Sequence, residues 1–339
     1  MASGVIFGGT GFIGVFFARL MIEKGIVDKV YLFDSEALSE KPSQFRQEIG
    51  SSDPRIGFVQ GDVRQPIMWR PREQVRLIAN LAAVHREPGH QDFEYYQTNL
   101  LGAENVCAFA ERVGCERMIF TSSISPYGPS EEEKDEGSLP VPATAYGGSK
   151  LAAEKIHQIW QAKDSARRRL VIARPGVVFG PSEGGNVSRL IKAVLGRYFF
   201  YMGNRDTRKA GTYVKELCNA MLWVLENQDK HHEQVSLFNM SMNPGPSIQE
   251  YVDAICNVAG VRRFVPGVPY KLLLVVSYCI DLFAKPLGIQ HPFSPVRIRK
   301  LVRSNNILPR YLEAKGYPYQ YTLRSAFDDW KKDCPEEWK

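Results

Sequence analysis

The chain has 339 residues, with 43 basic and 37 acidic side chains and therefore a net charge of +6. Hydrophobic residues make up 44% of the chain and charged residues 24%, which is ordinary globular composition and excludes a disordered chain, collagen and a coiled coil. The length suits an enzyme of two lobes. A net charge of +6 gives no reason by itself to expect nucleic acid as a partner.

Six scattered cysteines form no C-x-x-C pair, which favours reduced thiols in a cytoplasmic protein. The histidines form no H-E-x-x-H motif, so no metal site is expected. A glycine-rich turn begins at residue 8 and leaves no room for a signal peptide before it. The most apolar later stretch, 270–284, falls short of the roughly 20 residues that a spanning helix needs, so it predicts a buried or surface-lying helix.

Short apolar runs alternate with helix-length segments through the first half of the chain. Runs of strand length occupy 4–7, 29–34, 56–62, 77–83, 117–123 and 169–175. Helices are expected over 12–24, 99–112, 187–196, 214–228, 247–259 and 296–303. Nearly continuous apolar runs are typical of parallel strands that are buried on both faces. The pattern predicts an α/β fold with a doubly wound parallel sheet, which places ligands at the carboxyl ends of the strands.

After residue 175 the pattern loosens, and glycine, proline and asparagine become frequent. We interpret 1–175 as the cofactor-binding domain, with a later contribution from 211–240. Residues 176–339 would then form most of a smaller, mixed α/β lobe that binds the substrate.

A glycine-rich loop connects the first strand to the first helix. Gly8, Gly11 and Gly14 lie in GGTGFIG, where glycines permit a tight turn and the helix N-terminus offers N–H groups to a pyrophosphate. Asp34 ends the second strand, where a carboxylate can accept hydrogen bonds from both ribose hydroxyls and would repel a 2′-phosphate. NAD is therefore favoured over NADP. Asp62, after the third strand, could reach the adenine.

Tyr146 and Lys150 are spaced i and i+4, which on a helix places both side chains on one face. An adjacent ammonium group favours the phenolate form of a tyrosine. Ser123, after the fifth strand, could hydrogen-bond the same substrate oxygen, and Ser122 is the alternative for that role. These residues predict proton transfer to or from a substrate hydroxyl.

Taken together, the motifs resemble the extended short-chain dehydrogenase/reductases, in particular the NAD-dependent epimerase/dehydratase family with its Rossmann-type sheet. They occur in the family's order over roughly residues 4 to 220. The resemblance is carried by GGTGFIG, Asp34, GDV (61–63), NLAAVH (80–85), TNLLGAENV (98–106), FTSSISPYG (120–128), AYGGSK (145–150) and ARPGVVFGP (173–181).

The resemblance implies a role for each matching residue. Tyr146 would be the acid/base, Lys150 its pKa partner and ribose anchor, and Ser123 the hydroxyl that positions the sugar oxygen. Asn99 would hold the geometry of the catalytic helix. The expected cofactor contacts are Gly8, Gly11, Phe12, Ile13, Gly14, Asp34, Asp62, Val63, Leu81, Ala82, Ala83, Asn99, Tyr146, Lys150 and Pro175.

Two departures from the family pattern concern the substrate. Ile124 and Ser125 stand where 4,6-dehydratases carry an acidic pair, which disfavours dehydration. The family's Arg-Asp-Tyr-x-His segment appears as KAGTYVKEL (209–217), which leaves the nucleotide open. The expected substrate contacts are His85, Ser123, Ser125, Asn186, Arg205 and Lys209.

The stretch from Lys285 to Arg310 contains six basic side chains and no acidic one. It could attract a substrate diphosphate, contact anionic lipid after the apolar 270–284 segment, or form a solvated helix face. The layout of this tail also resembles the 3β-hydroxysteroid dehydrogenase branch of the superfamily.

The leading hypothesis is a cytoplasmic, NAD-dependent nucleotide-sugar 4-epimerase of polysaccharide biosynthesis that acts through a transient 4-keto sugar. The alternatives are a 4-ketosugar reductase, a 3β-hydroxysteroid-type alcohol dehydrogenase, and a non-enzymatic NAD sensor. The intact Ser-Tyr-Lys set argues against the sensor. We expect a homodimer that binds a nucleotide sugar and no nucleic acid. Membrane contact is disfavoured, and 270–303 is the segment left open for it.

Overall fold

The structure, a computed structural model, describes residues 1–86, 89–284 and 304–339. The predicted helix over 296–303 and most of the basic stretch 285–310 lie outside the described residues.

A seven-stranded parallel sheet forms the centre of the molecule, in the order β3-β2-β1-β4-β5-β6-β10. All six predicted strands are present. A seventh, β10 (Val235–Met240), comes from the later part of the chain and pairs with β6. The other bounds are β1 (Ala2–Phe7), β2 (Lys29–Asp34), β3 (Ile56–Gln60), β4 (Gln74–Asn80), β5 (Arg117–Thr121) and β6 (Arg169–Pro175).

Three strands end earlier than the apolar runs predicted. β3, β4 and β5 stop two or three residues before the ends of those runs, and the remaining residues leave the sheet at its carboxyl edge. There the Leu81 N–H still donates to the Phe7 carbonyl oxygen at 2.9 Å. Strand order reverses between β1 and β4, so this edge holds the crevice in which doubly wound sheets bind ligands.

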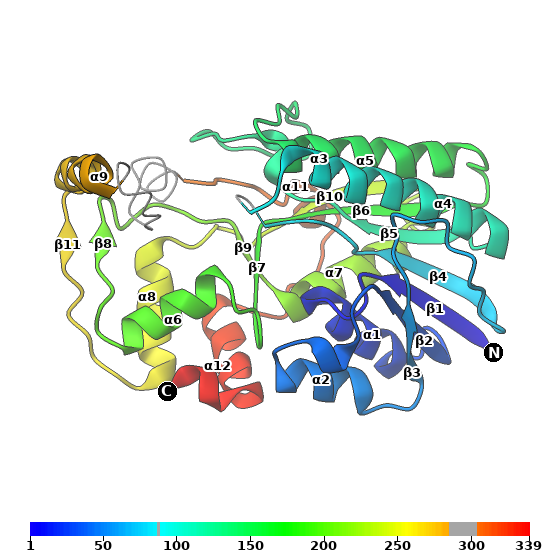
Figure 1. Cartoon of the computed structure of the whole chain (residues 1–339), viewed down its shortest axis with the longest axis horizontal. Helices are drawn as coiled ribbons and strands as arrows, with labels where there is room; N and C mark the ends of the chain where they lie inside the picture. The colour runs from blue at the N-terminus through cyan, green and yellow to red at the C-terminus, as the bar shows by residue number, and fades with distance from the viewer. Residues whose placement is uncertain (87–88, 285–303) are drawn as a thin grey trace.

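Helices cover both faces of the sheet (Figure 1). One face carries α1 (Phe12–Glu23), α2 (Gln44–Ser51) and α7 (Val214–Asn227). The other carries α3 (Asp92–Tyr96), α4 (Gly102–Val113) and α5 (Ala145–Ala162). A π-helical turn, Gln97–Leu101, precedes α4, so the helix predicted from residue 99 begins as a wider turn. These layers confirm the predicted Rossmann-type α/β class.

The C-terminal lobe packs three helices around an aromatic core. These helices are α6 (Asn186–Leu195), α8 (Ile248–Ala259) and α12 (Leu323–Asp333). Two short parallel ladders accompany them: β7 (Val177–Phe179) with β9 (Gly211–Tyr213), and β8 (Tyr201–Met202) with β11 (Gly267–Val268). A further helix, α11 (Arg310–Ala314), packs on β10. Ring contacts join Phe179, Tyr213, Tyr251, Phe327 and Trp330.

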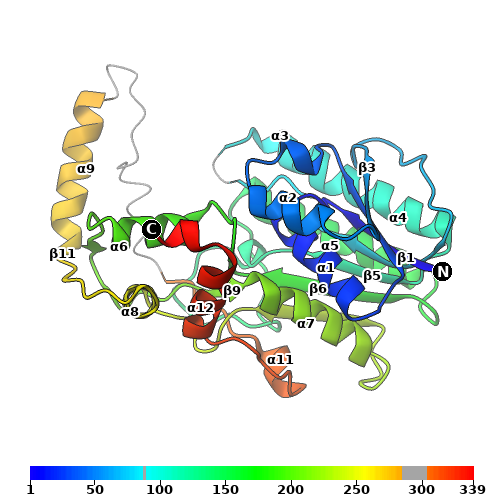
Figure 2. The same cartoon turned by 90° about the horizontal axis from the view of Figure 1, so that it is seen from below.

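Helix α9 (Tyr270–Ala284) lies at the end of the molecule farthest from the N-terminal strands (Figures 1 and 2). It is surface-lying, one of the two placements that its sequence predicts. No helix within the described residues is both long and apolar enough to cross a membrane.

The acidic run 131–138 contacts the C-terminal part of the chain instead of lying free in solvent. The Lys134 N–H donates to the Asn306 carbonyl, and the Leu308 N–H donates to the Lys134 carbonyl. A Glu136 carboxylate oxygen accepts the Asn239 N–H at 2.8 Å, and burial raises the pKa of this carboxyl. The segment thus ties residues 304–308 to β10.

Candidate active site

Glycines of the loop between β1 and α1 stand where there is no room for a side chain. Gly8 adopts a φ of +72°, and a Cβ there would lie 2.7 Å from the Ala82 nitrogen. A Cβ on Gly14 would lie 2.4 Å from the Gly9 carbonyl oxygen. Gly11 caps α1 without a side-chain hydrogen bond, and the first turn, which includes Phe12, carries no acidic residue. This helix terminus therefore presents backbone N–H groups and positive potential to an anion.

Asp34 is held at the rim of this loop. One carboxylate oxygen accepts the Thr10 N–H at 3.2 Å, and the other accepts the Glu36 N–H at 3.4 Å. The nearest basic residue in the following sequence, Lys41, is paired with Glu36 at 2.6 Å. Its charge is therefore partly neutralised, and a 2′-phosphate at the Asp34 carboxylate would meet net repulsion. The glycine loop and this carboxylate fit the pyrophosphate and ribose of NAD.

The expected adenine contact, Asp62, is engaged with a neighbour. Its carboxylate pairs with Arg64 at 2.6 Å, and the hydrogen bond from Arg64 lowers the pKa of Asp62. The adjacent Val63 is buried, and its carbonyl accepts the Asn105 side chain at 2.8 Å. The Arg64 and Asn105 side chains therefore both hold the segment 61–63 in place at the carboxyl end of β3.

The turn that follows β4 lies directly against the glycine loop. Ala82 contacts Gly8 closely enough that no side chain would fit between them. Leu81 and Ala83 flank it at the carboxyl edge of the sheet. Pro175 ends β6 on the same edge, and its carbonyl accepts the Ile124 N–H at 3.1 Å. The predicted cofactor contacts at the ends of five strands, β1, β2, β3, β4 and β6, therefore lie along one edge.

The first two turns of α5 carry the predicted proton-transfer pair. Thr144 caps the helix by accepting the Gly147 N–H at 3.2 Å, which fixes Tyr146 in the first turn. Lys150, one turn later, is 1% exposed, and its ammonium lies 4.5 Å from the centre of the Phe120 ring. Burial lowers the pKa of Lys150 to about 7, an effect that the Glu154 carboxylate opposes.

The two serines after β5 point to different neighbours. The Ser122 hydroxyl donates to the buried Glu154 carboxylate at 2.5 Å. The Ser123 hydroxyl instead donates to the Ser125 hydroxyl at 3.1 Å and accepts the Ser125 N–H. Ser122 is therefore committed to the interior. Ser123 is the better candidate to meet a substrate oxygen.

A buried ion pair lies behind the catalytic helix, and sequence analysis did not single it out. Arg174 binds Glu154 through two hydrogen bonds of 2.8 and 2.6 Å, and the side chains are only 4% and 1% exposed. The guanidinium also lies 4.8 Å from the centre of the Tyr127 ring. Glu154 follows Lys150 by four residues on α5, so the Tyr-x₃-Lys-x₃-Glu spacing was the available signal.

Asn99 ties the π-helical turn to the catalytic helix. Its amide nitrogen donates to the Ser149 hydroxyl at 2.9 Å, and its oxygen accepts the Val84 N–H at 3.1 Å. Ser149 in turn donates to the Tyr146 carbonyl oxygen at 2.9 Å. This chain of bonds supports the positioning role that the resemblance implied for Asn99.

The expected substrate contacts occupy several segments. His85 is exposed after β4, and its pKa is lowered by partial desolvation and by the nearby Arg86 and Lys150 cations. Asn186 opens α6, where its side-chain oxygen accepts Arg189 at 2.8 Å. Arg205 and Lys209 lie between β8 and β9, and burial lowers the pKa of Lys209.

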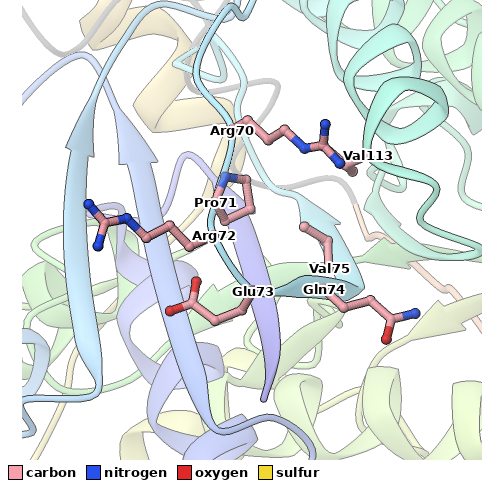
Figure 3. Close-up of a pocket in the computed structure, with 7 residues that line it drawn as sticks. All are labelled: Arg70, Pro71, Arg72, Glu73, Gln74, Val75 and Val113. Atoms are coloured by element: carbon pink, nitrogen blue, oxygen red, sulfur yellow. The ribbon is translucent and has the colours of Figure 1, made fainter.

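A hollow of about 290 Å³ lies elsewhere on the molecule (Figure 3). It is lined mainly by residues 70–75, at the amino end of β4. Because the glycine loop lies at the carboxyl ends of the strands, this hollow does not belong to the site.

The fold and the site define a dinucleotide-dependent enzyme with a Ser-Tyr-Lys set at the carboxyl edge of a parallel sheet. The sequence model of the NAD dependent epimerase/dehydratase family matches residues 5–239, and the chain belongs to this family. The predicted dependence on NAD is thereby confirmed.

Three relatives illustrate the range of similarity. The N-acetyl-alpha-D-glucosaminyl-diphospho-ditrans,octacis-undecaprenol 4-epimerase of Escherichia coli O157:H7 is 28% identical, over 96% of this chain and 92% of the relative. The decarboxylating sterol-4-alpha-carboxylate 3-dehydrogenase of Candida albicans is 22% identical over 98% of both chains. The solved UDP-glucuronic acid 4-epimerase of Bacillus cereus, in complex with NAD, aligns with a TM-score of 0.76 and 16% identity over 99% of this chain and 100% of that one, which shows the shared fold.

Proposed function

We propose that the protein inverts the C4 hydroxyl of a sugar linked to a diphosphate, in an NAD-dependent reaction. One structural observation carries the proposal: Tyr146 and the buried Lys150 occupy successive turns of α5, while the Ser123 hydroxyl bonds to Ser125 and not to the buried Glu154. The 28% identity to a 4-epimerase over 92% of that enzyme's length supports the same reaction.

The proposed reaction uses proton transfer at the Tyr146 hydroxyl oxygen. As the phenolate, Tyr146 takes the proton from the sugar 4-hydroxyl, and it returns this proton after the sugar has turned over in the site. Ser123 donates a hydrogen bond to the same sugar oxygen and so stabilises the charge that develops there. Bound NAD supplies the hydride acceptor and donor at C4. Lys150 favours the phenolate through its positive charge.

The residues also distinguish between related reactions. No carboxylate follows Ser123 in sequence, since Ile124 and Ser125 occupy those places, so elimination of a 6-hydroxyl is disfavoured. The relative with 28% identity favours epimerisation over the 4-ketosugar reductase and 3β-hydroxysteroid dehydrogenase alternatives. An intact proton-transfer set would have no use in an NAD sensor.

The remaining features of the proposal concern the setting of the reaction. We expect a cytoplasmic homodimer that contributes to polysaccharide biosynthesis. A nucleotide is the carrier that the sequence motifs favour. The relative with 28% identity is named for a lipid-linked diphosphate instead. Arg205 and Lys209 are the cations that we assign to the diphosphate of either carrier.

The test of the proposal is the variant Tyr146→Phe, with Tyr198→Phe as a matched control at an exposed surface position. Loss of a positioned proton-transfer group lowers turnover by about 10²–10⁴-fold. We expect this loss in Tyr146→Phe with NAD affinity retained in calorimetry, and full activity in the control. If Tyr146→Phe keeps more than about a tenth of the activity, Tyr146 is not the acid/base.

A further inference from the structure

Helix α9 exposes an apolar face to solvent. Leu272, Val275, Val276, Tyr278 and Leu282 are between 45% and 70% exposed in the described part of the chain. At 100° per residue these positions fall within a single stripe about 160° wide. Leu273 and Ser277, on the opposite side of the helix, are 8% and 0% exposed. The helix therefore has one buried side and presents an apolar face to solvent.

The segment that contains α9 carries a net positive charge. Between Gly260 and Ile280 the sequence has three basic side chains, Arg262, Arg263 and Lys271, and no acidic one. Over 261–284, the described part of this segment, Asp281 is the single acidic residue, so the segment has a net charge of +2. Phe264, which precedes β11, is 93% exposed.

The position of α9 connects this face to the substrate lobe. Strand β11 directly precedes α9 and pairs with β8, and β8 is followed by the segment that contains Arg205. Figure 2 shows α9 at the outer end of the lobe, where it projects away from α6 and α8. A partner bound to the exposed face of α9 would therefore lie next to the lobe that contains the proposed diphosphate contacts.

We propose that the exposed face of α9 docks on an anionic lipid bilayer, and that the sugar substrate is carried by a lipid diphosphate in that bilayer. The second part rests on the proposed 4-epimerase function. Exposed aliphatic and tyrosine side chains beside basic residues are the composition of interfacial helices. The 15 residues of α9 would lie in the plane of the interface and do not span it.

The positive charge near α9 favours a bilayer, and not a second copy of this chain, as the partner of the exposed face. In a two-fold contact the same surface meets itself, so Lys271 and its basic neighbours would face like charges. Anionic headgroups instead complement these cations, because the negative surface potential of such a membrane attracts basic side chains.

The first experiment measures vesicle binding by flotation of the full chain, without substrate. The vesicles are phosphatidylcholine alone or phosphatidylcholine with 30% phosphatidylglycerol. We expect wild type to float with the anionic vesicles and to be released by high salt. Val275→Glu should weaken binding at least about tenfold, because a carboxylate replaces an inserted aliphatic group. Ile159→Glu, on α5, is the matched control, since Ile159 and Val275 are 60% and 59% exposed.

Three outcomes would overturn the docking surface. Wild type could fail to float, Val275→Glu could bind as well as wild type, or the neutral vesicles could bind the protein equally. If instead Val275→Glu changes the oligomeric state in light scattering and wild type binds no vesicles, the face contacts a second copy of the chain.

The second experiment separates the substrate class from the epimerase function. Wild type and Val275→Glu are given N-acetylglucosamine linked through diphosphate to a long polyprenol in anionic vesicles, and UDP-N-acetylglucosamine in solution. We expect wild type to prefer the vesicle substrate at least about tenfold, and Val275→Glu to lose that preference. Equal use of the two carriers would overturn the lipid-carrier proposal while leaving epimerisation standing. Inversion of neither sugar would overturn the 4-epimerase function, whereas flotation would still report on the surface alone.

Discussion

The buried Glu154–Arg174 pair predicts a large loss of stability in Glu154→Gln. The substitution preserves side-chain volume but removes the only carboxylate bonded to the Arg174 guanidinium among the described residues, and it weakens the acceptor for Ser122. Both side chains are at most 4% exposed, so solvent cannot replace the lost charge. Breaking one side of such a pair costs about 3–5 kcal/mol.

The assay is denaturant unfolding of the NAD-free protein at neutral pH. The matched control is Glu111→Gln, because Glu111 pairs with Lys163 at 2.9 Å on the surface, where ion pairs contribute less than about 1 kcal/mol. The double variant Glu154→Gln/Arg174→Met should recover at least half of the loss, since it removes the stranded cation. Equal, small losses in Glu154→Gln and Glu111→Gln would refute the reasoning.

Three further predictions follow from the site. Asp34→Ala should lower the affinity for NAD at least about tenfold in calorimetry, because hydrogen bonds to a charged acceptor contribute about 1.5–3 kcal/mol. The variant should also show a smaller preference for NAD over NADP than wild type. Equal affinities of wild type for NAD and NADP would contradict this prediction. The pKa of Lys150 is about 7 in the folded protein, against the ordinary lysine value of 10.5 that applies in the unfolded chain. Between pH 7 and pH 10.5 the unfolded chain therefore binds more protons than the folded protein. Wild-type stability should therefore rise relative to Lys150→Met between pH 7 and 10, by up to about 4 kcal/mol, and a constant difference across that range would refute it. Ser123→Ala should lower turnover with little change in melting temperature, whereas Ser122→Ala should lower the melting temperature; the reverse pattern would reassign the two hydroxyls.

The sequence predicted the sheet and the glycine loop because both depend on local patterns. Six apolar runs marked six strands, and GGTGFIG lies between β1 and α1 as expected. The strand ends were less predictable, because hydrophobicity does not tell a paired residue from one that leaves the sheet. Residues 81–83 are as apolar as β4 itself, yet they form the turn against Gly8.

Features that depend on tertiary packing could not be predicted from the sequence. Ser122 and Ser123 are chemically equivalent neighbours, and only the fold directs one of them to Glu154 and the other to Ser125. The apolar composition of α9 predicted a helix but not which face would remain exposed. The backbone of Lys134, in the acidic run 131–138, pairs with Asn306 and Leu308, a contact for which the sequence carries no local pattern.

The most direct test of the proposed epimerisation is C4 inversion without added cofactor. The purified protein would be incubated with UDP-N-acetylglucosamine, UDP-glucose and polyprenyl-diphosphate-linked N-acetylglucosamine, and the sugars would be followed by NMR together with absorbance of the reduced cofactor. We predict that at least one of these sugars is inverted at C4, with no net accumulation of reduced cofactor and no released ketone. Stoichiometric cofactor reduction with a released 4-keto sugar would contradict the account.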